Sequence, residues 1–445
     1  MGAIIANHGV GKEGVNLVKN PLQLSDGEAT QLQNAELVPD QATGGEGSLS
    51  KRGGLAALTS ALAGSVLGMM SLPLQTTYTR YLYCGQGNAD SDTWLRTTDG
   101  STWVEVASPA RPARTYDKYY TPHSGQTALV NCSRRGVSYK TRMLFMGDDY
   151  TVGSTCPPVI QWDESTSVEL FRIPIGPNSD GDEPTAVTDM LLANGKIYFA
   201  IAEKAAGGAF HGGRVMEYDP RTSIVKQVCN SMGVGAGEVD GQNVPTCLAY
   251  YQGQLWVGLH ASNSGVATIG KVIRCYPDVD TVWTTDVANL TGKPNSLLEF
   301  GGDLYVATSL SDSSGTISKR SAASTAWSDV ASLAQSDYTM LREYGGKLYA
   351  VRYTDDVSDS LLILESSDGS SWSTSRDVYA NDSGGVLVHP VGAAVFNDRL
   401  FYAFEPVSHA DNGTGGFILM NNAGTWSKIH TGNVNGPMIT LVQRS

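Results

Sequence analysis

Ser296-Leu-Leu-Glu-Phe-Gly-Gly-Asp-Leu-Tyr-Val-Ala307 is the stretch that decides the fold. Its two short apolar segments contain the branched and aromatic residues that strands prefer. Between them, the Gly-Gly pair supplies the positive φ angles that a tight hairpin needs. The stretch therefore predicts a β-hairpin, and a Ser/Asp/Gly loop with two further short strands completes the unit near Trp327.

The apolar–aromatic pair of this hairpin returns along the chain about every 50 residues, a period typical of blade-like β repeats. The pairs are Leu82-Tyr83, Leu144-Phe145, Ile197-Tyr198, Leu255-Trp256, Leu304-Tyr305, Leu348-Tyr349 and Leu400-Phe401. Roughly two dozen residues after each pair, a Trp or branched residue begins a predicted outer strand of the same repeat. These residues are Trp103, Val168, Ile224, Trp283, Trp327, Trp372 and Trp426.

Four short strands per repeat make a blade, and blades packed around an axis bury surfaces that none could bury alone. The sequence therefore predicts an all-β protein, a seven-bladed β-propeller with an extended N-terminal arm. The arm is assigned to residues 1–53 and the propeller to residues 54–445. After the last repeat, 436–443 reads as one more inner strand, which we expect to pair near residues 54–70 and close the ring.

Two predicted turns share a pattern, Thr97-Thr-Asp-Gly-Ser-Thr-Trp103 and Ser366-Ser-Asp-Gly-Ser-Ser-Trp372. Both resemble the Asp-box turn of sialidase-type propellers, although each is one residue shorter. Asp99 and Asp368 are expected to accept hydrogen bonds from their own backbone amides, and the following glycine to take the left-handed corner. The repeated tryptophans Trp103, Trp283, Trp327, Trp372 and Trp426 are expected to be buried, blade-stabilising residues.

Composition limits the possible functions. The net charge of −13 leaves few cations to neutralise phosphates, which argues against DNA binding by counterion release. The sequence contains no apolar run long enough to span a membrane, so no membrane insertion is expected. The amino terminus lacks the features of a signal peptide. The six cysteines show no Cys-x-x-Cys spacing, so buried reduced thiols and synthesis in a cytoplasm are expected.

The arm does not follow the repeat. Ser25 and Glu28 have capping-box spacing, which predicts a short helix over Glu28 to Leu37. A hairpin is expected over residues 47–54. The apolar side chains of a segment too short for its own core are expected to dock on another subunit or protein. The predicted docking residues are Leu17, Leu22, Leu24, Leu32 and Leu37, and the pair Lys51 and Arg52 is expected at the hinge or in a solvated turn.

The arm also carries a family resemblance. Its order is Pro21-Leu22, Asp26-Gly-Glu-Ala29, Asn34-Ala-Glu-Leu37 and then Gly47-x-Leu-x-Lys-Arg-x-Gly54. This order resembles the opening of many tailed-phage virion proteins, among them the propeller-bearing nozzle or hub proteins of short-tailed phages.

The resemblance implies a structural protein of the virion tail, made in the host cytoplasm. The implied partners are other tail proteins, such as adaptor, portal-proximal or fibre components. The implied assembly is a homo-hexameric ring that forms or decorates the channel, through which genomic DNA passes without specific binding. An acidic wall would let DNA slide through such a channel.

No catalytic constellation is apparent in the sequence. The seven histidines are dispersed without metal-ligand spacing, and the glycine-rich stretches lack the Lys-Ser/Thr of a phosphate loop. No catalytic residue, metal ligand or cofactor is therefore expected, and the protein is predicted not to be an enzyme. The alternative hypothesis is an Asp-box propeller that binds or cleaves glycans, as a tail-fibre lectin or a sialidase-like enzyme.

Overall fold

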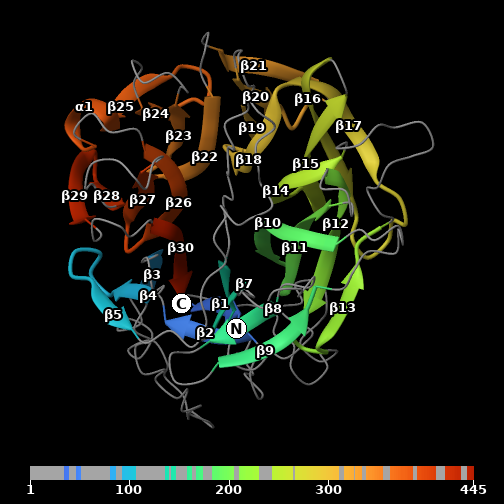
Figure 1. Ribbon diagram of the computed structural model, residues 1–445, viewed down its shortest axis with the longest axis horizontal. Coiled ribbons are helices and arrows are strands. Elements are labelled where there is room, and N and C mark those ends of the chain that lie inside the picture. The colour runs from blue at the N-terminus through green and yellow to red at the C-terminus, as the bar shows by residue number, and fades with distance from the viewer. Residues whose placement is uncertain are drawn as a thin grey trace, which may run out of the picture. The chain divides into compact units, whose positions relative to one another are not determined.

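Figure 1 shows the computed structural model of the chain. The structure describes residues 35–39, 47–51, 81–86, 93–106, 136–139, 142–146, 158–162, 167–173, 183–204, 210–229, 243–263, 266–309, 315–324, 326–332, 337–353, 361–383, 388–406, 416–431 and 438–444. The chain divides into two compact units, Met1–Thr79 and Arg80–Ser445. The predicted boundary after residue 53 lies outside the described residues.

In the described part of the second unit, six antiparallel sheets each consist of four strands that are consecutive in the sequence. They are β6–β9 (Gly136–Tyr139, Arg142–Met146, Pro158–Trp162, Ser167–Arg172), β10–β13 (Glu183–Ala193, Lys196–Lys204, Phe210–Asp219, Ile224–Gln227), β14–β17 (Val244–Tyr251, Gln254–Asn263, Val266–Cys275, Thr284–Thr291), β18–β21 (Lys293–Phe300, Asp303–Ser309, Thr316–Arg320, Trp327–Ser332), β22–β25 (Asp337–Tyr344, Lys347–Tyr353, Leu362–Ser366, Ser373–Asp377) and β26–β29 (Val388–Phe396, Arg399–Pro406, Phe417–Asn422, Thr425–Thr431). One short helix, α1 (Val378–Asn381), follows β25.

A further four-stranded sheet joins the two ends of this unit. Its first strand is β30 (Met438–Arg444), which pairs antiparallel with β3 (Tyr81–Gln86), and β4 (Thr93–Thr97) and β5 (Val104–Val106) follow. The register places Tyr81 opposite Arg444. The predicted pairing of the C-terminal strand is therefore right in kind, but the expected partner near residues 54–70 is wrong. The last strand pairs instead with the strand that carries the first apolar–aromatic pair.

The first strands of successive sheets contact one another in the order β6, β10, β14, β18, β22, β26 and β30, and β30 in turn contacts β6. Sheets arranged with their first strands innermost and their fourth strands outermost make a β-propeller (Figure 1). The predicted all-β class and propeller arrangement are confirmed.

The repeated apolar–aromatic pair lies on the second strand of every four-stranded sheet described. Neighbouring residues of a strand point to opposite faces, so the two members of a pair can pack against the two neighbouring sheets. Leu304, for example, packs with Trp256 of the preceding sheet, whereas Tyr305 packs with Leu348 of the following sheet. The core is thus divided among the interfaces between neighbouring sheets, which we call seams. This explains why the motif returns once per sheet.

Positive-φ residues form the tight turns between first and second strands. Gly301 and Gly302 have φ of 60° and 85°, and Gly345 and Gly346 have φ of 58° and 72°. The pair Asn397 and Asp398 takes the same place with φ of 47° and 54°. Positive φ at both central residues is the geometry of hairpins whose twist matches that of the flanking strands. The hairpins expected from the Gly-Gly and Asn-Asp pairs are confirmed.

Within the first unit, β1 (Ala35–Pro39) and β2 (Gly47–Lys51) form an antiparallel hairpin. Leu37 therefore lies on a strand opposite Leu49, and the helix predicted to reach Leu37 is wrong at that end. The prediction relied on the capping-box spacing at Ser25, but the residues at the other end of the predicted helix favour a strand. Leu37, Val38 and Pro39 favour extended backbone, and a proline excludes a continuing helix. Residues 28–34 lie outside the described part of the chain.

Candidate functional site

The two predicted Asp turns adopt nearly the same geometry. Asp99 Oδ1 accepts the backbone N–H groups of Ser101 and Thr102, both at 2.8 Å, and the Thr97 hydroxyl at 2.9 Å. Thr97 Oγ1 in turn accepts the N–H of Gly100 at 2.8 Å. These bonds, that from Thr102 first, hold the pKa of Asp99 well below its usual range. The carboxylate is bonded to its own turn.

Asp368 repeats this arrangement between β24 and β25. Its Oδ1 accepts the N–H groups of Ser370 and Ser371 at 2.7 Å and the Ser366 hydroxyl at 3.0 Å. Its Oδ2 accepts the Ser371 hydroxyl at 2.9 Å, and the bonds, led by that from the Ser371 amide, lower the pKa of Asp368. Gly369 has φ +70°, as the predicted left-handed corner requires.

Each Asp turn also packs on the preceding sheet. A Cβ added at Gly369 would overlap the Tyr305 hydroxyl, and one added at Gly100 would lie 2.6 Å from Phe401 Cζ. Tyr305 and Phe401 are the aromatic residues of the repeated pair in those preceding sheets. Asn397 Nδ2 also donates to Thr98 O at 2.9 Å. The turns thus join neighbouring sheets, in addition to closing their own hairpins.

The repeated tryptophans are half-buried, which corrects the expectation that they are buried. Trp103, Trp283, Trp327, Trp372 and Trp426 each pack against a core cluster as partly exposed residues. They lie at or beside the start of the outer strands of their sheets. Among the tryptophans whose burial the structure describes, Trp162 and Trp256 are instead the fully enclosed ones, at 1% exposure.

Two of the repeated tryptophans donate a hydrogen bond across a seam to the preceding sheet. Trp327 Nε1 donates to Asp286 Oδ1 at 2.7 Å, and Trp426 Nε1 donates to Ser375 Oγ at 3.0 Å. Asp286 is also bonded by Arg320 at 2.9 Å and by Arg274 at 3.1 Å. Because its side chain is only 4% exposed, this carboxylate depends on its cationic partners.

The inner strands carry a set of side-chain hydrogen bonds to the next sheet. They run from Thr188 Oγ1 to Pro245 O (2.7 Å), from Thr246 Oγ1 to Pro294 O (2.6 Å), from Asn295 Nδ2 to Tyr338 O (3.2 Å), from Leu248 N to Asp189 Oδ2 (2.7 Å) and from Leu341 N to Ser296 Oγ (3.2 Å). Sequence reasoning missed these residues. The signal was present, because Thr246 and Asn295 each follow a proline at a β-bulge of the inner strand.

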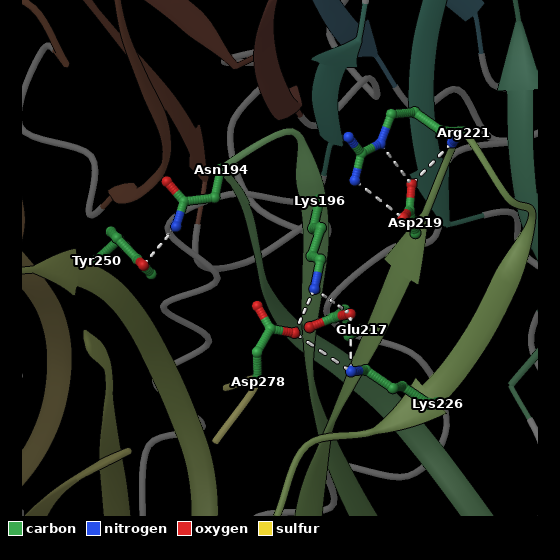
Figure 2. Close-up of polar contacts among 8 residues, drawn as sticks. All are labelled: Asn194, Lys196, Glu217, Asp219, Arg221, Lys226, Tyr250 and Asp278. Atoms are coloured by element: carbon green, nitrogen blue, oxygen red, sulfur yellow. Dashed lines mark hydrogen bonds and ion pairs between the residues drawn. The ribbon is translucent and has the colours of Figure 1, made fainter. Parts of the chain in front are cut away.

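Four charged residues form a cluster at the seam between sheets β10–β13 and β14–β17 (Figure 2). Lys196 of β11 donates to Glu217 of β12 at 2.9 Å and to Asp278 of the β16–β17 loop. Lys226 of β13 lies 3.4 Å from both carboxylates. Beside the cluster, Asn194 donates to the Tyr250 hydroxyl across the same seam.

The lysines and carboxylates of this cluster stabilise each other in their charged forms. Burial alone would lower the pKa of Lys196, but its hydrogen bonds to Asp278 and Glu217 outweigh that effect and raise the pKa. The bond from Lys196 is the first cause that lowers the pKa of Asp278. Both groups are therefore charged at neutral pH, and the cluster is an ionic link between two sheets.

Most of the predicted docking residues lie outside the described part of the chain, namely Leu17, Leu22, Leu24, Leu32 and Arg52. Leu37 lies on β1, and Lys51 ends β2. The described residues therefore do not test the predicted docking set, and its role stays a prediction.

Among the described residues, no group of three or more His, Cys, Asp or Glu side chains could hold a metal ion. Within the same ranges, no helix is long and apolar enough to cross a membrane. Cys84, Cys247 and Cys275 are buried, and Cys229 is half-buried. Cys132 and Cys156 lie outside the described ranges.

No protein-family model and no curated protein matches this sequence. Among solved structures, one similar chain comes from a work titled "Structural and Mechanistic Analysis of Two Prolyl Endopeptidases: Role of Inter-Domain Dynamics in Catalysis and Specificity". It has a TM-score of 0.47 and 12% identity, over 79% of this chain and 50% of that chain. This chain thus spans half the length of that protein.

Proposed function

We propose that this protein is a non-enzymatic structural component of a phage tail, a nozzle- or hub-like ring protein that forms or decorates the DNA channel. The observation that carries the proposal is the order of the sequence motifs from Pro21 to Gly54, which precede a propeller in the chain. We further propose that each of the seven four-stranded sheets is one blade of a single ring, with the arm of residues 1–53 as its assembly element.

The hydrogen bonds and ion pairs at the seams support a structural role for the propeller. Several carboxylates of the described residues are bonded within the fold, among them Asp99 in its turn and Asp286 between two arginines. Glu217, at 3% side-chain exposure, faces two lysines. A propeller whose sheets are joined by hydrogen bonds and ion pairs is suited to holding a fixed shape during assembly and DNA passage.

The partners in this proposal are other tail proteins, such as adaptor, portal-proximal or fibre components, and sister copies in a homo-hexameric ring. The protein is made in the host cytoplasm and ends in the virion tail. The net charge of −13 supports passage of DNA without specific binding, because a wall with excess negative charge repels phosphates. No cofactor or membrane insertion is part of the proposal.

The arm provides the experiment. Deleting residues 1–45 is expected to leave a soluble propeller with an unchanged melting temperature that no longer forms rings or joins tail particles. Replacing Leu17, Leu22 and Leu24 by serine in the full chain is expected to give the same loss of assembly. Leu192→Ser is the matched control, because Leu192 is a 38% exposed leucine outside the arm. If the deleted chain still assembles, or fails to fold, the assembly role of the arm is wrong.

The second candidate is a glycan-binding or glycan-cleaving Asp-box propeller, which the geometry of the two Asp turns favours. The two functions differ in a measurable way. A lectin or sialidase binds sugars as a monomer or small oligomer, whereas a channel protein assembles into rings and does not bind sugars. A glycan array probed with the full chain separates them, and binding abolished by Asp368→Asn without loss of stability would favour the second candidate.

A further inference from the structure

Two cysteines from neighbouring sheets meet at the seam that also holds the charged cluster. Cys275 is the last residue of β16 and is 1% exposed, and Cys229 follows β13 and packs half-buried against the same core cluster. Cys229 thus packs against the cluster that contains Cys275, and each thiol shifts the pKa of the other. Cys229 Sγ also donates to Asp280 O at 3.5 Å, in the loop that follows Cys275.

The local structure holds Cys229 in position. Its φ of 53° lies in the left-handed region, which residues other than glycine seldom occupy unless their surroundings impose it. On one side, the neighbouring Val228 N–H donates to Val215 O at 2.8 Å and anchors the segment to β12. On the other side, Asp280 fixes the facing loop, since its carboxylate accepts the Tyr276 N–H at 2.8 Å.

We propose that Cys229 and Cys275 are a redox-sensitive pair whose Sγ atoms form a disulfide across the seam between sheets β10–β13 and β14–β17. Two different sheets hold these thiols at one core cluster, and a disulfide requires two thiols that are held close together because it tolerates only a narrow range of geometry. This inference is independent of the proposed tail function.

The oxidant is a small disulfide such as oxidised glutathione. The Cys229 thiolate, the more exposed of the two, attacks one glutathione sulfur, and the S–S bond breaks to release one glutathione thiolate. The Cys275 thiolate then attacks the Cys229 sulfur and displaces the second glutathione. The protein loses two protons and two electrons, and the oxidant becomes two thiols. Reduction by a dithiol reverses both exchanges.

The reaction is expected to be slow at neutral pH and faster as the pH rises. Burial raises the pKa of both thiols, so only a small fraction of either is thiolate at pH 7. The pair is therefore expected to stay reduced during brief exposure to an oxidant and to be cross-linked only after longer exposure.

The test uses the full native chain incubated with oxidised glutathione, followed by acid quenching, alkylation and peptide mapping by mass spectrometry. The expected result is the loss of two alkylatable thiols, one linked peptide pair that contains Cys229 and Cys275, and reversal by dithiothreitol. A stable glutathione adduct on Cys229 of the unmutated chain would overturn the proposal. So would linkage of either thiol to Cys132 or Cys156, a disulfide-linked dimer, or continued alkylation of both thiols after exhaustive oxidation.

Single variants assign the two roles. Cys275→Ser is expected to trap glutathione on Cys229, because the second thiol is missing, whereas Cys229→Ser is expected to leave Cys275 unmodified. Cys247→Ser is the matched control, since Cys247 is a buried thiol in the next seam, and it is expected to keep the linked peptide pair. Equal glutathione trapping by Cys275→Ser and by the unmutated chain would contradict the exchange.

Discussion

The contact between each Asp turn and the preceding sheet can be tested at Gly369. This residue has φ +70°, and a Cβ there would overlap the Tyr305 hydroxyl and lie 2.5 Å from Cζ and 2.9 Å from Cε1. Tyr305 is 1% exposed and sits in the core of the seam, so its ring has little room to move. Gly346 is the matched control, because its φ is +72° and nothing lies within 4 Å of its added Cβ.

Both substitutions destabilise the protein through the left-handed backbone, and only Gly369→Ala adds an overlap with a neighbouring ring. A left-handed backbone costs a residue with a Cβ about 1 kcal/mol, and this applies to both Gly346→Ala and Gly369→Ala. Overpacking against a fixed aromatic ring adds about 1–3 kcal/mol at Gly369 alone. We expect Gly369→Ala to lower the free energy of unfolding by about 2–4 kcal/mol and Gly346→Ala by about 1 kcal/mol.

Urea unfolding followed by tryptophan fluorescence measures both values, and circular dichroism checks that each variant keeps its strand content. The reasoning would be refuted if the two variants lost the same free energy of unfolding. It would then follow that the Asp turn does not pack on the preceding sheet as described.

Three further predictions concern the seams and the ring. Trp327→Ala is expected to lower the free energy of unfolding by about 2–4 kcal/mol, and Trp327→Phe by about 1 kcal/mol, since only the second keeps the ring packing while losing the bond to Asp286. Equal losses in urea titrations would contradict this. Deleting residues 438–445 removes β30 and exposes the edge of β3, so the chain should become insoluble or melt several degrees lower, and an unchanged melt would refute ring closure. Burial, then the charge of Lys293, lowers the pKa of His260 from 6.5 to about 3. Between those values the unfolded chain binds a proton that the native chain does not, so stability falls as pH falls from 6.5 toward 3. His260→Gln should reduce that fall in melting curves recorded across the range, and an identical pH profile would contradict it.

The second strands and hairpins could be predicted because their signals are local. An apolar–aromatic pair such as Leu304-Tyr305 must bury both faces of one strand, and Gly301-Gly302 dictates a turn without reference to the rest of the chain. The Asp turn was predictable for the same reason, because the bonds of Asp368 reach only its nearest neighbours.

Features that depend on which strands become neighbours could not be predicted from the local sequence. The C-terminal strand pairs with β3 and not with the predicted partner near residues 54–70, since any free strand edge satisfies the same local pattern. The exposure of Trp327 follows from its place at the rim of a seam. The meeting of Cys229 and Cys275 at one core cluster depends on which two sheets become neighbours, and their spacing in the sequence carries no sign of it.

The location of this subunit in a phage particle tests the central claim most directly. An antibody raised against the propeller, imaged by electron microscopy on tailed particles from the source of this sequence, should label the tail below the head. A reconstruction at that position should show a ring of propellers with six-fold symmetry. Particles without label, together with a purified chain that stays monomeric and binds glycans, would contradict the account.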